Sequence, residues 1–268
     1  MTGPMSPKFA ANLTLLFADL PFLARFEAAA AAGFQAVECQ FPYAVPAGVI
    51  KDELAAHELR LVLYNLPAGD WAAGDRGIGC HPDRVDEFRA GVEQALAYAE
   101  ALDCPALNCL AGILPAGVTE AAARRTLVAN LAFAAATTAA VGRTLLVESI
   151  NGHDVPGFLL RRTQDAAAVI GEVGAPNLKL QLDLYHAARE GEDPVATIDR
   201  FGALIGHVQI ADVPGRHEPG TGVLDFPAAF AALDRAGYAG WVGCEYNPRG
   251  ATVEGLVWRT PYLTGRRT

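Results

Sequence analysis

The chain lacks any long apolar run. No hydrophobic stretch approaches the roughly 20 residues that a helix needs to span a bilayer. The opening, Met1–Lys8, also lacks the apolar segment of a secretory signal peptide. These absences exclude an integral membrane protein, and we expect a soluble protein in the cytoplasm.

Cysteine is scarce and is not arranged in pairs. The five cysteines are an odd number with no C-x-x-C spacing, which argues against a disulfide framework and against a zinc ribbon. Cys39, Cys109 and Cys244 lie in apolar runs, where a free cysteine usually serves as a small buried side chain. We therefore expect structural thiols rather than a nucleophile.

Positive charge is also in short supply. The chain has 21 Lys and Arg residues against 30 Asp and Glu residues, a formal net charge of -9. A surface of that sign repels phosphate backbones, so we do not expect a nucleic acid partner. A local basic pocket is compatible with this total.

What the chain does have is a regular alternation of short apolar runs and longer helical patterns. Helical segments between strands indicate βαβ units and a parallel sheet. Eight such units in a chain of 268 residues, 51% of them hydrophobic, indicate a closed barrel. Without a linker, we expect residues 1–268 to form a single (β/α)8 TIM barrel domain of the α/β class. The eight predicted strands are Phe9–Leu13, Ala36–Gln40, Leu61–Asn65, Ala106–Leu110, Thr144–Glu148, Leu178–Asp183, His207–Ile210 and Gly240–Glu245.

Several helical patterns begin at residues that favour the N-cap position. The side-chain oxygen of such a residue accepts a hydrogen bond from a backbone N–H of the first turn. The candidate caps are Thr119, Thr163, Asp193 and Asp225.

Four of the predicted strands place a polar residue at or near their end. These are Glu148, Asp183, Gln209 and Glu245. A carboxylate at the end of a buried strand is costly unless a cation or a hydrogen-bond network compensates it. In a parallel barrel all such ends meet at one mouth. Three carboxylates and one amide oxygen there predict a site for a hard divalent metal, with Mg²⁺ or Mn²⁺ favoured by the oxygen ligands.

Such a cage indicates proton-transfer chemistry. A divalent metal that binds two adjacent oxygens of an α-hydroxycarbonyl compound polarises the carbonyl and acidifies the neighbouring C–H. Glu148 and Glu245, on either side of the proposed metal, are the candidate acid/base pair. The intermediate is an enediolate, which the charge of the metal stabilises. Asp183 and Gln209 would then be mainly ligands.

Other side chains are expected around the same mouth. His186 and Arg216 are candidates for binding the oxygens and the carboxylate of a substrate. Asn65 ends the third predicted strand, and Trp71 on the following loop is a candidate cover for a small substrate. Each also has a structural interpretation: a core histidine, a surface arginine, or a tryptophan that packs its loop onto the barrel.

Two more polar residues fall on predicted strands. His207 precedes Gln209 by two residues, so it points to the same side of the strand but deeper. We favour a core role for it. Asn108, near the end of the fourth strand, is a weaker candidate for the mouth.

Four segments form long, distinctive motifs: Asn65–Gly74, Gln209–Asp212, Glu218–Gly222 and Gly240–Tyr246. They resemble the hydroxypyruvate isomerase family, within the larger group of xylose-isomerase-like barrels, and the resemblance extends from Phe9 to Trp258. Tyr64 differs, because some members of the family have His before the Asn.

This resemblance implies a metal-dependent isomerase. Its substrate would be a small hydroxy-oxo acid, hydroxypyruvate, interconverted with 2-hydroxy-3-oxopropanoate (tartronate semialdehyde), a reaction of carbohydrate acid and glyoxylate metabolism. The resemblance also implies Glu148 and Glu245 as the acid/base pair, with Asp183 and Gln209 completing the metal site.

Neighbouring reactions stay open. A 2-oxo-tetronate isomerase acts on a four-carbon sugar acid by the same chemistry, and one extra carbon is worth only about 1–3 kcal/mol in a pocket. A ketose 3-epimerase uses the same two glutamates but commonly has His at the position of Gln209. A DNA-repair endonuclease on the same barrel uses zinc ions held by many histidines, which six histidines and a charge of -9 match poorly.

The oligomeric state is open as well. The segment Arg259–Thr268, with Tyr262 and Leu263, is a candidate contact with a second copy in a homo-oligomer or with its own barrel.

Overall fold

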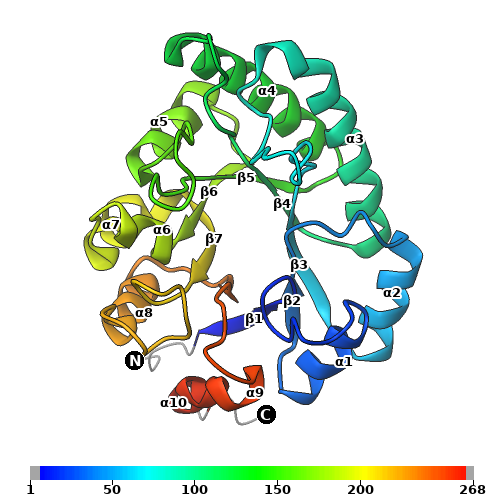
Figure 1. The fold of residues 1–268 in the computed structure, drawn as a ribbon, viewed down its shortest axis with the longest axis vertical. Helices are drawn as coiled ribbons and strands as arrows, with labels where there is room; N and C mark the ends of the chain where they lie inside the picture. The colour runs from blue at the N-terminus through cyan, green and yellow to red at the C-terminus, as the bar shows by residue number, and fades with distance from the viewer. Residues whose placement is uncertain (1–6, 264–268) are drawn as a thin grey trace.

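Eight parallel strands close into a barrel in the computed structural model, which describes residues 7–263 (Figure 1). The strands follow one another in chain order around the barrel, and β8 pairs with β1. The predicted (β/α)8 fold is confirmed, with strand boundaries within two residues of those expected. The strands are β1 (Lys8–Asn12), β2 (Ala36–Glu38), β3 (Arg60–Asn65), β4 (Ala106–Cys109), β5 (Thr144–Glu148), β6 (Leu178–Asp183), β7 (Ile205–Ile210) and β8 (Trp241–Cys244).

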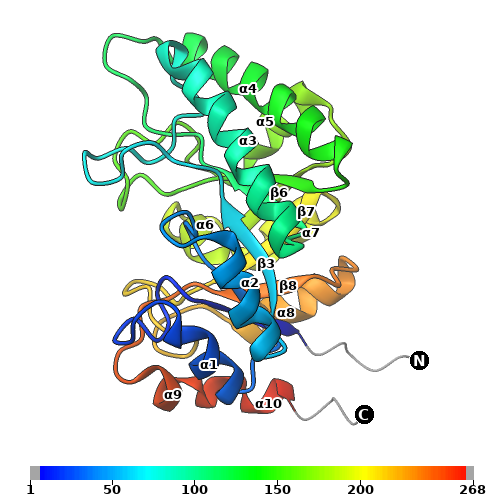
Figure 2. The same ribbon diagram turned by 90° about the vertical axis from the view of Figure 1, so that its right-hand side faces the viewer.

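Helices surround the barrel on the outside (Figure 1), and the side view shows the long loops that follow the strands gathered at one end (Figure 2). Those loops define the mouth on which the candidate residues converge. The helices are α1 (Ala24–Ala31), α2 (Ala47–Ala56), α3 (Val85–Leu102), α4 (Glu120–Ala140), α5 (Thr163–Val173), α6 (Leu184–Arg189), α7 (Pro194–Phe201), α8 (Phe226–Arg235), α9 (Thr252–Gly255) and α10 (Thr260–Leu263). Short 3₁₀ turns lie at Pro82–Arg84, Gly202–Leu204 and Leu256–Arg259.

Three of the four expected helix caps are present. The side chains of Thr119, Asp193 and Asp225 each accept a hydrogen bond from the backbone N–H three residues on. The prediction for Thr163 was wrong, because this residue lies inside the first turn of α5. Its hydroxyl donates instead to Glu192 at 2.6 Å. The carboxylate of Asp165 accepts from the backbone N–H of Arg162 and stabilises the start of the helix.

The barrel interior has an apolar layer at the amino ends of the strands. Trp241 packs against this layer. The layer consists of small and branched side chains, those of Ala10, Ala36, Val62, Leu63 and Leu146. A second, larger core lies between the sheet and the helices. All five cysteines are buried and unpaired, as expected of structural thiols. Burial raises the pKa of Cys80 to about 11.

The end of the described chain packs on its own barrel. The ring of Tyr262 lies 5.1 Å from that of Phe230 and 6.1 Å from that of Phe9, measured between centroids. Leu263 is 48% exposed. The rest of the predicted contact segment, 264–268, and residues 1–6 of the opening lie outside the described residues. Within residues 7–263, no helix combines the length and the apolar character needed to cross a bilayer.

Candidate active site

The four predicted polar residues all lie at the carboxyl end of the barrel. Glu148 and Asp183 end β5 and β6, Gln209 is the fifth residue of β7, and Glu245 follows β8 directly. All four side chains are buried. The parallel register aligns Asp183 with Gln209 on the neighbouring strand, which brings residues far apart in sequence to one mouth.

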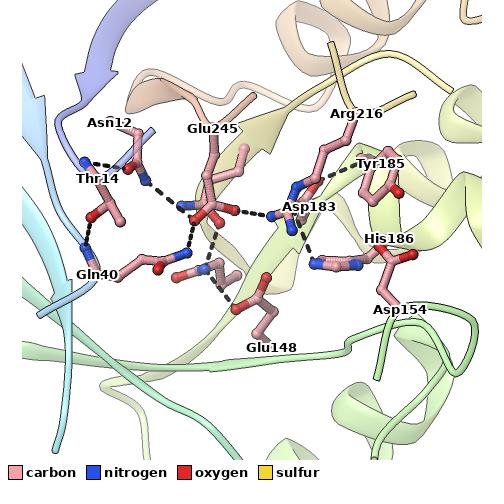
Figure 3. A network of polar contacts seen from close by, with 12 residues as sticks. Asn12, Thr14, Gln40, Glu148, Asp154, Asp183, Tyr185, His186, Arg216 and Glu245 are labelled. Atoms are coloured by element: carbon pink, nitrogen blue, oxygen red, sulfur yellow. Dashed lines mark hydrogen bonds and ion pairs between the residues drawn. The ribbon is translucent and has the colours of Figure 1, made fainter. Parts of the chain in front are cut away.

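Glu245 is held by three donors, which Figure 3 shows turned toward its carboxylate. Arg216 Nη2 lies 2.6 Å from Oε2, while Gln40 Nε2 and Asn12 Nδ2 lie 3.1 and 3.2 Å from Oε1. Burial raises the pKa of Glu245, and the Arg216 guanidinium opposes that shift. The net shift is upward, and Arg216 limits it by favouring the charged form.

Among residues 7–263, no cationic side chain lies at hydrogen-bond distance from Glu148. Its Oε2 accepts from the neutral amides of Asn108 at 3.0 Å and Gln181 at 2.9 Å. Burial, with the charges of Glu245 and Asp183, raises the pKa of Glu148 well above its usual range. The protonated form is therefore favoured here, more strongly than at Glu245, which has the Arg216 guanidinium at 2.6 Å.

Asp183 keeps one oxygen without a hydrogen bond. Its Oδ1 accepts from the Tyr185 N–H at 2.8 Å, whereas the buried Oδ2 has no hydrogen-bond partner among the described residues. His186 Nε2 and Arg216 Nη2 lie 3.6 and 3.7 Å from Oδ2. Burial raises the pKa of Asp183 to about 7, partly offset by the Arg216 charge.

Gln209 belongs to a polar layer that continues below the mouth. Its Nε2 donates to Glu38 and its Oε1 accepts from Gln181, both at 2.7 Å. Glu38 also pairs with His207 Nε2 at 2.7 Å, so His207 has the core position expected of it. Gly243 makes room for the Glu38–His207 pair, because a Cβ there would collide with a Glu38 carboxylate oxygen.

Glu38 and the amides of Asn12, Gln40 and Gln181 were not predicted from the sequence. The two-residue alternation of a strand could have found Glu38 and Gln181. Gln181 precedes Asp183 by two residues, and Glu38 precedes Gln40 by two, so each pair faces the barrel interior.

Arg216 does not reach out to solvent but turns inward. Its backbone adopts a left-handed φ of 53°, and its guanidinium lies 5.1 Å from the Tyr185 ring. The buried Asp212 shapes the loop by accepting four backbone N–H groups, those of Val213, Gly220, Gly222 and Leu224. Although burial opposes it, the carboxylates of Glu245 and Asp183 raise the pKa of Arg216. Arg216 thus neutralises part of the carboxylate cluster.

Asn65 connects to the mouth indirectly. Its Oδ1 accepts from Asn108 Nδ2 at 3.0 Å, and the same amide nitrogen donates to Glu148. Tyr64, the next residue back, faces the helices, where its hydroxyl donates to the Ala95 carbonyl at 2.8 Å. The Tyr in place of His is therefore part of the packing and lies away from the mouth.

Trp71 is 42% exposed on the loop after β3. Its ring lies 5.1 Å from the Phe41 ring, and the Arg76 guanidinium lies 4.2 Å above it. The side chain thus packs its own loop while leaving much of its surface open.

The opposite end of the barrel also has hollows. Two adjoining ones of about 780 and 890 Å³ share Glu58, Arg60 and Trp241. In this fold the amino end serves stability and the carboxyl end carries the chemistry. The carboxylate cluster lies at the carboxyl end, so we place the candidate site there.

The residues at the mouth fit a divalent cation. Ligand atoms of Glu148, Asp183 and His186 lie within 4.8 Å of one another, a group that does not include Glu245. The buried Asp183 Oδ2 has no hydrogen bond among the described residues, and a bound cation would give this oxygen a partner. Carboxylate and amide oxygens suit Mg²⁺ or Mn²⁺.

Comparisons with known proteins identify the family of this chain. The chain belongs to the xylose isomerase-like TIM barrel family, whose model matches residues 26–262. It is 47% identical over 255 residues to hydroxypyruvate isomerase of Escherichia coli (strain K12), covering 95% of this chain and 99% of that protein. The resemblance inferred from the motifs is confirmed, and the chain is an enzyme of the isomerase type.

Two further relatives are equally similar. The 2-oxo-tetronate isomerase of Cupriavidus necator is 47% identical over 257 residues, covering 96% of this chain and 99% of that protein. A solved structure from Brucella melitensis, described as an AP endonuclease, family 2, superposes with a TM-score of 0.93 at 47% identity, covering 96% and 99% of the two chains.

Proposed function

We propose that the protein interconverts hydroxypyruvate and 2-hydroxy-3-oxopropanoate by moving a proton between C3 and C2. The observation that carries this proposal is the pair of buried carboxyl groups, Glu148 and Glu245, in different surroundings: Glu245 is paired with the Arg216 guanidinium, and Glu148 with neutral amides. Two titratable groups whose environments push their pKa values apart are suited to act as acid and base. The name of the Escherichia coli relative supports the choice of substrate.

The surroundings assign the roles. Glu245 has a guanidinium at 2.6 Å, which favours the carboxylate and hence a general base. Glu148 is bonded to neutral amides, and its pKa is raised by burial and by neighbouring carboxylates, which favours a general acid.

The proton balance of the reaction is as follows. Glu245 removes a proton from C3 of hydroxypyruvate, the electron pair forms a C2–C3 double bond, and the carbonyl π electrons move to O2. Glu148 delivers a proton to C2, while the O3 proton passes to O2 and the O3–C3 carbonyl forms. No other atom is gained or lost. The two carboxyl groups end with exchanged protonation states, which exchange with solvent resets.

A divalent cation completes the proposal. The oxygens of Glu148, Asp183, Gln209 and Glu245 are the proposed ligands. When bound, Mg²⁺ or Mn²⁺ would polarise the substrate carbonyl and stabilise the charge of the enediolate. The Gln209 oxygen already accepts one hydrogen bond, from Gln181, and has a second lone pair for a ligand role.

The remaining candidates are assigned to the substrate. Arg216 would bind the substrate carboxylate, and His186 would hydrogen-bond a substrate oxygen. Asn65 and Trp71 would contribute at the rim, Asn65 by supporting Asn108 and Trp71 by covering the substrate.

A four-carbon 2-oxo-tetronate is the second candidate substrate. The relative from Cupriavidus necator is as similar as the one from Escherichia coli. The two substrates share the reacting carbons, so the same pair of glutamates serves both.

Proton NMR in D₂O tests the function. We expect metal-stripped protein given hydroxypyruvate to show deuterium incorporation and 2-hydroxy-3-oxopropanoate only after Mg²⁺ or Mn²⁺ is added. Equal rates without metal would remove the cation from the proposal but keep the glutamates. No exchange with hydroxypyruvate, together with exchange of a 2-oxo-tetronate, would select the second candidate.

A further inference from the structure

Asn151, three residues after the end of β5, has its amide orientation fixed by the backbone. Its Oδ1 accepts from the N–H groups of His153 at 3.1 Å and Asp154 at 2.8 Å. Backbone N–H groups only donate, so the oxygen of Asn151 must face this turn. The amide nitrogen must therefore face the opposite way.

On that side lies His186. The Asn151 Nδ2 is 2.6 Å from His186 Nδ1 and 3.1 Å from Asp154 Oδ2. An amide nitrogen has no lone pair to offer, so Nδ1 of the imidazole must be the acceptor. A neutral imidazole carries one proton, which this contact assigns to Nε2.

The same contact excludes the doubly protonated ring, because its Nδ1–H would then point at the Asn151 amide nitrogen, which can only donate. His186 is buried. Nε2 faces Asp183 Oδ2, 3.6 Å away, on the side of the ring toward the carboxylate cluster.

We propose that Asn151 is a positioning residue that fixes His186 as the Nε2–H tautomer, so that the ring donates a hydrogen bond to a substrate oxygen rather than ligating a metal. Nε2 of His186 is close enough to the acidic oxygens to complete a ligand set, but a protonated nitrogen cannot coordinate a cation. The part that concerns the substrate rests on the proposed function. The tautomer itself does not.

Nitrogen-15 NMR of the full-length, metal-free protein tests the tautomer. The two ring-nitrogen signals of His186 are assigned by their absence in His186→Ala. We expect them to show a protonated Nε2 and an unprotonated Nδ1. In Asn151→Asp a carboxylate oxygen of the same shape replaces the donor, so the proton should move to Nδ1. Asn177→Asp, a matched change at an amide that contacts Ala135, Thr138 and Arg143, should leave the His186 pattern unchanged.

Activity and metal binding complete the test. We expect Asn151→Asp to lower kcat/KM for hydroxypyruvate about 10–100-fold, as is typical when a residue that orients an active-site group is lost. Mn²⁺ affinity, measured by titration, should change less than about twofold in His186→Ala. Any one of three results would overturn the proposal. They are a protonated Nδ1 in the natural protein, an unchanged His186 pattern in Asn151→Asp, and a tenfold loss of Mn²⁺ affinity in His186→Ala. Inactivity of the natural protein toward both substrates would instead reject the proposed function and leave the NMR result to judge the tautomer.

Discussion

The two ends of the barrel interior differ sharply in chemistry. At the amino end the inward positions hold alanine, valine and leucine, closed by Trp241. At the carboxyl end they hold buried carboxyl, amide and imidazole groups, including Glu38, Glu148, Asp183 and His207. Apolar burial stabilises a fold, whereas a buried carboxylate costs free energy unless its partners compensate. The apolar layer at the amino end therefore stabilises the fold, whereas the polar layer at the carboxyl end forms the candidate site.

The polar end keeps its charges apart with neutral amides. Gln181 lies between Glu148 and Gln209, and Asn12 donates to both Glu38 and Glu245. These donors satisfy carboxylate oxygens without adding positive charge. Of the three described donors to Glu245, Arg216 is the one that carries a charge, which gives the two glutamates their different surroundings.

The largest expected effect is at the polar end. Replacing Glu148 or Glu245 by Gln should lower kcat by about 10²–10⁴-fold, the usual contribution of a general acid or base, while the protein still folds. Steady-state kinetics with hydroxypyruvate and thermal melting by circular dichroism measure the two parts. If either variant keeps turnover within threefold of the natural protein, the assigned pair is wrong.

At the apolar end we expect a large loss of stability with little change in kcat. Leu146→Ala removes a fully buried side chain two residues before Glu148 and should lower the free energy of unfolding by about 2–5 kcal/mol. Urea unfolding gives this value, and kcat at a temperature where the variant is folded should stay near that of the natural protein. A fall in kcat as large as that of Glu148→Gln would show that the two ends are not separate.

A smaller effect is expected from pH. The pKa of Asp183 is raised from 3.8 to about 7 by burial, so the folded protein binds this proton more tightly than the unfolded chain does. The contribution of Asp183 to the free energy of unfolding should therefore fall as pH rises from about 4 to about 7.

Asp183→Asn is the matched control, since it lacks this titration. In metal-free protein, urea unfolding of the two forms should diverge across that pH range, with the natural protein losing stability relative to the variant. Added Mn²⁺ should restore the natural protein at pH 8, because a ligand that binds only the folded state stabilises it. If the free energies of unfolding of the two proteins change in parallel with pH, the raised pKa of Asp183 is wrong.

The smallest effect is expected in the layer of helices around the strands. Asp225 caps α8 through a 2.9 Å hydrogen bond from the Ala228 N–H, so Asp225→Ala should lower the free energy of unfolding by about 1 kcal/mol. Kinetic constants should be unchanged. A loss of activity in this variant would mean that modest destabilisation alone affects turnover, and the glutamate variants would then need correction for it.

The barrel could be predicted from sequence because its signals are local. Apolar runs of the right length and spacing specify strands such as Thr144–Glu148 without knowledge of their neighbours. The positions of Glu148 and Asp183 at strand ends followed from the same pattern.

The partners of those residues could not be predicted, because they depend on the closed barrel. The contact between Glu38 and His207 joins residues 169 positions apart. Arg216 meets Glu245 only because Asp212 folds the intervening loop inward. The hydrogen bond between Asn151 and His186 likewise joins the loop after β5 to α6, which follows β6.

The buried cysteines have a practical consequence for experiments on this molecule. Every thiol is enclosed, and burial raises the pKa of those at 80, 104 and 109 to between about 11 and about 12, so little reactive thiolate exists at neutral pH. Val223, on the same loop as Arg216, is 77% exposed. A fluorophore attached through Val223→Cys would therefore label one site without removal of any natural cysteine, and would report on the movement of that loop.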